Sequence, residues 1–96
     1  MKNKEEIKKN VKEVMQKYKI HSASFFGSIL SNNFDSDSDI DILYELESNH
    51  NYSLLDIAGI LLDLEEKTQR KVDLVRSQSI KPSLRSSILA KTESII

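Results

Sequence analysis

The sequence predicts an α/β (α+β) fold: a small mixed β-sheet of at least three strands, with helices packed mainly on one face. Two observations carry this prediction. Apolar residues recur every three or four positions in separate segments, as in amphipathic helices. Short apolar runs with strand character lie between those segments. Because 96 residues are the size of one small domain, we expect residues 1–96 to form a single domain with a modest core.

Three helices are predicted, each from an apolar face or a start signal. The first covers about residues 3–18 and has an apolar stripe made of Ile7, Val11, Val14, Met15 and Tyr18. The second runs from Ser53, which forms a capping box with Asp56, to about Lys67. Its broad apolar face should belong to the core and comprises Leu54, Ile57, Ala58, Leu61, Leu62 and Leu64. The third starts at Pro82, which suits a first helical turn, and carries Leu84, Ile88 and Leu89.

Three strands are predicted between these helices, at residues 22–26, 40–46 and 72–75. Gly27 ends the first strand, and Ser28 is expected to cap a short helix that reaches Asn32 or Asn33. Polar loops are expected over residues 33–38 and 48–52. In the middle strand, alternation puts Ile40, Ile42, Tyr44 and Leu46 on one face, and Asp39, Asp41, Leu43 and Glu45 on the other.

The candidate site is formed by Gly27-Ser28, ten intervening residues, and Asp39-Ile40-Asp41. Asp39 and Asp41 are two positions apart on a strand, so their carboxylates project from one face. Paired carboxylates are ligands for divalent cations in nucleotide chemistry. Gly27 has no Cβ and permits close approach of a phosphate, and Ser28 with the following amides would offer an anion site. Asp73, on the third strand, is the candidate third acid.

This spacing resembles the signature of the nucleotidyltransferase superfamily that includes DNA polymerase β. That signature is Gly-Ser, a linker of similar length, Asp-x-Asp, and a third acid on a later strand. The resemblance is carried by FFGSILSNNFDSDSDIDILYEL and by Lys71-Val72-Asp73-Leu74-Val75. The short chain points to the minimal nucleotidyltransferases (MNT), which are found as antitoxins beside HEPN-domain toxins. The resemblance therefore implies a nucleotidyltransferase-like minimal core.

The resemblance also implies a reaction and its participants. It implies Mg²⁺-dependent transfer of AMP from ATP to a tyrosine hydroxyl of a HEPN toxin, which silences the toxin. Asp39, Asp41 and Asp73 would be the catalytic and metal-binding residues for two Mg²⁺ ions, with Mn²⁺ as a substitute. Gly27 and Ser28 would bind the triphosphate. Homo-oligomerisation stays open.

One departure favours a different class of protein. Many relatives have an Arg after Gly-Ser, whereas Ile29-Leu30 follow here, and no Lys or Arg occurs between Gly27 and Lys67. The alternative is an antitoxin with a weak site that neutralises its toxin by direct complex formation.

The run from Asp35 also begins like an EF-hand calcium loop, but Ile40 and Leu46 occupy positions that require Gly and Glu.

Charge and composition limit the other classes. Residues 35–47 carry six acids and no base, and the chain has a formal net charge of −1. Direct binding to a nucleic-acid backbone is not expected, because it needs a basic face. The absence of cysteine excludes thiolate metal sites and disulfides. No apolar run reaches membrane-spanning length and no signal peptide is visible, so a cytoplasmic location without membrane contact is expected.

Overall fold

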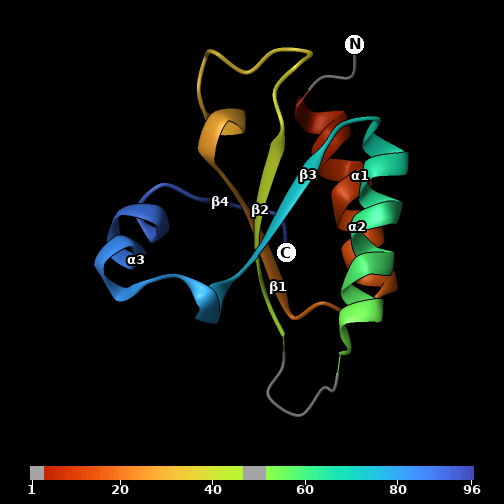
Figure 1. The fold of residues 1–96 in the computed structure, drawn as a ribbon. Helices are drawn as coiled ribbons and strands as arrows, with labels where there is room; N and C mark the ends of the chain where they lie inside the picture. Colours follow the sequence, from red (N-terminus) through yellow and green to blue (C-terminus); the bar gives the residue numbers. More distant parts are fainter. Residues whose placement is uncertain (1–3, 47–51) are drawn as a thin grey trace.

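The computed structural model describes residues 4–46 and 52–96, and Figure 1 shows the arrangement of its elements. The helices are α1 (Lys4–Lys17), α2 (Leu54–Thr68) and α3 (Pro82–Leu89). The strands are β1 (Ser22–Phe26), β2 (Ile40–Glu45), β3 (Val72–Arg76) and β4 (Glu93–Ser94). Short 3₁₀ helices, η1 (Gly27–Leu30) and η2 (Ser77–Ser79), follow β1 and β3. The predicted mixed α/β fold is confirmed.

The strands form one mixed sheet in the order β3-β2-β1-β4. β1 is antiparallel to β2 and to β4, whereas β2 and β3 are parallel. Parallel neighbours need a crossover connection, and α2 provides it. β4 was not predicted, because two paired residues are too short to show alternation. It continues into Ile95, whose backbone N–H donates to Ala23 O at 2.8 Å.

The core lies between the sheet and two helices. Figure 1 shows α1 and α2 together on one side of the sheet and α3 on the opposite side. Ile7 and Val11 of α1 and Leu64 of α2 are fully buried against Phe25 and other strand residues. No residue of α3 is buried. Helices are thus packed mainly on one face, as predicted.

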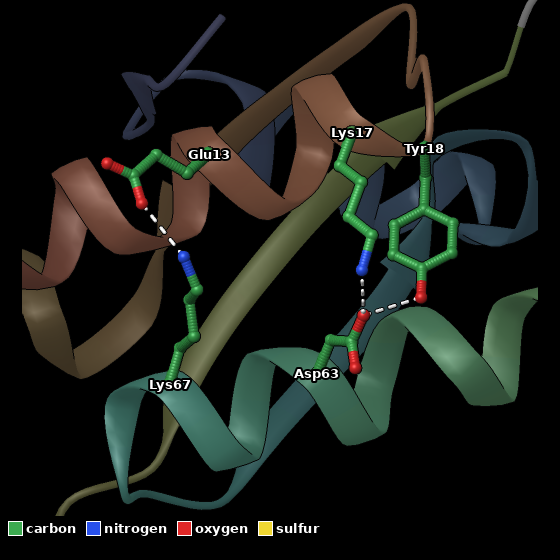
Figure 2. Close-up of polar contacts among 5 residues, drawn as sticks. All are labelled: Glu13, Lys17, Tyr18, Asp63 and Lys67. Atoms are coloured by element: carbon green, nitrogen blue, oxygen red, sulfur yellow. Dashed lines mark hydrogen bonds and ion pairs between the residues drawn. The ribbon is translucent and has the colours of Figure 1, made fainter.

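Polar contacts join α1 to α2 along their exposed seam, as Figure 2 shows. Lys67 Nζ lies 2.8 Å from Glu13 Oε2, and the lysine holds the pKa of Glu13 below its usual range. Asp63 Oδ2 accepts from Tyr18 Oη at 2.5 Å and from Lys17 Nζ at 3.3 Å. The Tyr18 bond, with Lys17, lowers the pKa of Asp63. These contacts fix the pairing of the helices that back the sheet.

The start of α2 is confirmed, but the extent of its apolar face was overestimated. Ser53 and Asp56 form the predicted capping box. Ile60, which was not predicted to be in the core, is buried, whereas Leu54 and Leu62 are 89% and 66% exposed. Ala58 is exposed as well. The sheet and α1 cover only one side of α2, so a face that spans six apolar residues cannot be buried entirely.

The alternation of β2 is confirmed on its inner face, where Ile40, Ile42, Tyr44 and Leu46 are buried. Leu43, on the other face, is also buried, and η2 contacts β2. That face is therefore partly covered. His50 and most of the loop predicted over 48–52 lie outside the described residues. Within residues 4–46 and 52–96, none of the helices has the length and apolar character to cross a membrane.

Candidate functional site

Asp41 and Asp73 are directly opposite each other on the parallel strands β2 and β3. Neighbouring strands lie about 4.8 Å apart, so the two residues are within reach of a common ligand. Val72 is buried and Leu74 is partly buried in the core, which leaves exposed Asp73 on the face away from α1 and α2. Asp39 lies immediately before β2, two residues from Asp41, and is exposed. The fold thus gathers the three predicted acids at one end of β2 and β3.

The pKa of Asp41 reflects both its burial and the charges of the neighbouring acids. Burial raises the pKa of Asp41 above its usual range, and the negative charges of Asp73 and then Asp39 raise it further. A hydrogen bond from the Ser28 backbone N–H opposes this rise. A site in which like charges repel one another gains stability when a cation binds among them. The arrangement therefore favours a cation over an apolar ligand.

Gly27 lies against Asp41 at the turn that leaves β1. Its φ of 74° is in the left-handed region that favours glycine. A Cβ at this position would overlap Asp41 Oδ2 and would lie 3.2 Å from Asp41 Cγ. Gly27 therefore makes room for the Asp41 carboxylate. The phosphate approach expected from the sequence is a separate role and stays a prediction.

Ser28 does not cap a helix as predicted. It lies inside η1, a 3₁₀ helix of four residues whose N-cap is Phe26 and which has no side-chain cap. Its hydroxyl donates instead to Asp39 O, at 3.4 Å. The turn is too tight for a capped helix that reaches Asn33, because Ser31 N already bonds back to Ser28 O at 2.9 Å. Ser28 thus contacts the backbone of one acid and the carboxylate of another.

Arg70 was missed by the sequence reasoning and lies beside the acidic loop. Its Nη1 donates to Asp35 O at 2.7 Å and to Ser38 O at 2.9 Å. Its guanidinium stands 4.4 Å from the centre of the Phe34 ring. Its only sequence signal is one of composition: in a chain without Lys or Arg between Gly27 and Lys67, Arg70 is the first Arg and lies two residues before the strand with the third acid.

The donor set at this site suits a hard divalent cation. Carboxylate oxygens from Asp39, Asp41 and Asp73 are the ligand type that Mg²⁺ and Mn²⁺ prefer. Over the described ranges, no group of three His, Cys, Asp or Glu side chains is gathered closely enough to enclose a metal ion. The three carboxylates would therefore have to converge when an ion binds. The room left by Gly27 is consistent with such a movement of Asp41.

Tyr44 and Tyr52, which could in principle stack on a base, contact other parts of the fold. Tyr44 is buried on the inner face of β2, and burial raises its pKa. Tyr52 donates its hydroxyl to Tyr18 O at 2.5 Å, at the end of α1. Exposed His21 directly precedes β1, at the end of the strand away from the three acids. The two tyrosines serve the fold rather than the candidate site.

Comparison with known proteins gives the family. A family model described as "Polymerase beta, Nucleotidyltransferase" matches residues 9–96. A candidate protein adenylyltransferase of Methanocaldococcus jannaschii is 35% identical over 91 residues, covering 95% of this chain and 96% of the relative. Another from the same organism is 39% identical over 87 residues, covering 88% and 86%. Both relatives align over nearly their whole length.

Solved structures share the fold. A structure described as a minimal nucleotidyltransferase superposes with a TM-score of 0.72 and 28% identity, over 88% of this chain and 85% of that one. The MNT antitoxin complex with a tri-AMPylated HEPN toxin of Shewanella oneidensis gives a TM-score of 0.73 at 16% identity, over 98% and 72%. Matched over 88 of its 96 residues, this chain belongs to the polymerase β-type nucleotidyltransferase family.

Proposed function

We propose that this chain is a Mg²⁺-dependent protein adenylyltransferase that transfers AMP from ATP to a tyrosine hydroxyl of a HEPN toxin, and so acts as its antitoxin. The observation that carries the proposal is the pairing of Asp41 with Asp73 on adjacent parallel strands, with Asp39 two residues away and Gly27 against Asp41. ATP as substrate is consistent with a reaction in the cytoplasm.

The reaction forms one bond and breaks one. The tyrosine oxygen bonds to the α-phosphorus of ATP, the bond from that phosphorus to the oxygen bridging to the β-phosphorus breaks, pyrophosphate leaves, and the hydroxyl proton passes to solvent. Two bound divalent ions would supply positive charge at the attacking and leaving oxygens. In the proposed site, Asp39 and Asp41 would hold both ions. Asp73 would serve mainly the ion at the attacking oxygen, and Gly27 and Ser28 would bind the triphosphate.

The descriptions of similar proteins support the choice of partner and nucleotide in this proposal. Two relatives are named as candidate protein adenylyltransferases. Structures with the same fold are described as toxin–antitoxin complexes, one with AMP-PNP and one with an AMPylated HEPN toxin. In this proposal the toxin would bring its own acceptor tyrosine to the site.

The proposal is tested by incubating the chain and its cognate toxin with ATP and Mg²⁺. Intact mass spectrometry should show toxin heavier by one or more AMP groups, and tandem mass spectrometry should locate them on tyrosine. Asp41→Asn should abolish the modification. Asp37→Asn is the matched control, because it makes the same change in an exposed loop acid outside the triad. An unmodified toxin that is still neutralised would contradict the proposal.

A second candidate function is that of an antitoxin that acts by binding alone. Two observations favour it: the chain lacks a Lys or Arg between Gly27 and Lys67, and Leu54 and Leu55 of α2 are 89% and 85% exposed. An apolar surface of this kind suits a stable protein contact. The double variant Asp39→Ala/Asp41→Ala separates the two functions: it should fail to protect if AMP transfer neutralises the toxin, and it should protect if binding suffices.

A further inference from the structure

We propose that Arg70 is a positioning residue: it anchors the loop of residues 34–38 to the start of β3 and thereby sets where Asp39 meets the other two acids. This inference rests on the proposed function for its catalytic consequence. The anchoring itself is a property of the protein without ligand. Arg70 touches no substrate in this role and acts through Asp39.

The contacts of Arg70 reach both ends of the loop. One nitrogen, Nη1, donates to Asp35 O at 2.7 Å and to Ser38 O at 2.9 Å. The guanidinium also lies over the Phe34 ring, 4.4 Å from its centre, where a cation is attracted by the ring face. Arg70 is only partly exposed, so these contacts are partly shielded from solvent.

The loop has hydrogen bonds of its own, but they hold it only to itself. Asp35 Oδ1 accepts from Asp37 N at 2.9 Å and from Ser38 Oγ at 3.1 Å. Ser38 N donates to Asp35 O at 3.2 Å. These bonds set the shape of the turn. Its position on the body of the domain therefore depends on the contacts of Arg70 and on the packing of Phe34 against the core.

The backbone on both sides of Asp39 is held by two consecutive residues, Arg70 and Lys71. Before it, Ser38 O accepts from the Arg70 side chain. After it, Ile40 N donates to Lys71 O at 2.9 Å. Both anchors come from the segment that enters β3, the strand that carries Asp73. The backbone on either side of Asp39 is thus fixed relative to Asp73, which is what two carboxylates need in order to share a metal ion.

The chemistry of Arg suits this role. The guanidinium binds carbonyl oxygens here, so the carboxylates of the loop are not consumed as its partners. It also places a permanent positive charge beside a segment with Asp35, Asp37 and Asp39, whose charges repel one another. A lysine has a point charge without the planar group, and cannot reproduce both the two carbonyl contacts and the stacking.

The test compares wild type with Arg70→Gln and Arg70→Lys, and uses Arg85→Gln as the matched control. Arg85 also donates Nη1 to a backbone carbonyl, Ser77 O at 3.2 Å, but away from the acids. The first readout is amide hydrogen exchange of the protein without ligand over residues 33–40. Arg70→Gln should speed it by about tenfold or more, as expected for loss of hydrogen bonds to a charged donor. Arg70→Lys should be intermediate, and Arg85→Gln should match wild type.

The second readout is thermal stabilisation by Mn²⁺ with an ATP analogue whose α,β bond cannot be cleaved. The Mn²⁺ concentration for half-maximal stabilisation should rise about 10- to 100-fold in Arg70→Gln, the usual effect of losing a group that orients a ligand. Unchanged exchange and unchanged Mn²⁺ dependence in Arg70→Gln would overturn the inference. If wild type shows no stabilisation at all, the proposed function fails, whereas the exchange data still decide whether Arg70 anchors the loop.

Discussion

Replacing Gly27 with alanine should destabilise the protein and disturb Asp41 at the same time. The backbone at Gly27 has a φ of 74°, and a new Cβ would overlap Asp41 Oδ2 and stand 3.2 Å from Asp41 Cγ. Two penalties therefore combine at one position. The left-handed backbone costs a residue with a side chain about 1–2 kcal/mol. The overlap adds about 1–3 kcal/mol, as overpacking does elsewhere.

A double-mutant cycle separates these penalties. Asp41→Ala removes Oδ2 and Cγ and leaves the Asp41 Cβ at 3.5 Å from the new atom, an ordinary contact. Urea denaturation of wild type, Gly27→Ala, Asp41→Ala and the double variant gives the four free energies of unfolding. The double variant should be more stable than the sum of the single changes predicts, by about 1–3 kcal/mol. The backbone penalty should persist in it.

Gly59→Ala is the control for the same chemical change. Gly59 lies within α2, where, among residues 4–46 and 52–96, a new Cβ would meet Tyr18 Oη at 3.8 Å and no other atom outside the helix. Alanine is favoured over glycine in a helix interior, so this variant should be about 0.5–1 kcal/mol more stable than wild type. Effects at Gly27 and Asp41 that add to within about 0.5 kcal/mol would refute the reasoning, because residues that do not touch are additive.

Further predictions concern charge, exposed leucines and salt. Because the pKa of Asp41 is raised in the folded protein, ionised Asp41 destabilises the fold at pH values above that pKa. This destabilisation disappears as the pH falls through the pKa and the carboxyl group becomes protonated. Without metal, melting curves at neutral pH should therefore show that Asp41→Asn is more stable than wild type. The difference should be under about 1 kcal/mol, because the group is only partly buried, and it should vanish in acid. In urea denaturation, Leu55→Ser should change stability by less than about 0.5 kcal/mol because Leu55 is 85% exposed. Ile60→Ala should cost about 2–5 kcal/mol because Ile60 is 1% exposed, and an equal cost for both would contradict the assigned burial of α2. Transfer to the toxin should weaken as ionic strength rises if the acidic segment 35–47 steers the encounter, and salt-independent rates would argue against such steering.

Local signals predicted the regular elements well. β1 was predicted with its observed bounds, and the capping box at Ser53 set the start of α2 within one residue. The placement of Asp73 one strand away from Asp41, on the same face, followed from alternation on each strand together with the resemblance to a known family, whereas their register came only from the structure. These features depend on residues that are close in the sequence, or on the alternation of side chains within a single strand.

The remaining features depend on tertiary contacts that a single sequence does not reveal. The apolar face of α2 was read as core throughout, yet only the part covered by the sheet and α1 is buried, and Leu62 lies outside it. Ser28 was read as a cap because Ser commonly caps helices, but the chain turns too tightly after Gly27. The bonds of Arg70 join positions 32 and 35 residues apart, and no local pattern indicates such a contact.

The register between β2 and β3 has a consequence for how this family can change over time. A slip of one residue along β3 would turn Asp73 toward the core and bring Val72 and Leu74 to the outer face, so the same apolar packing that stabilises the sheet also keeps the acids aligned. The packing of the sheet depends little on Asp73 in turn, because the exposed Asp73 side chain contributes its charge and little packing. With the proposed role of Asp73, one substitution there would remove catalysis and leave the fold, so a chain of this kind could keep a binding role without losing its shape.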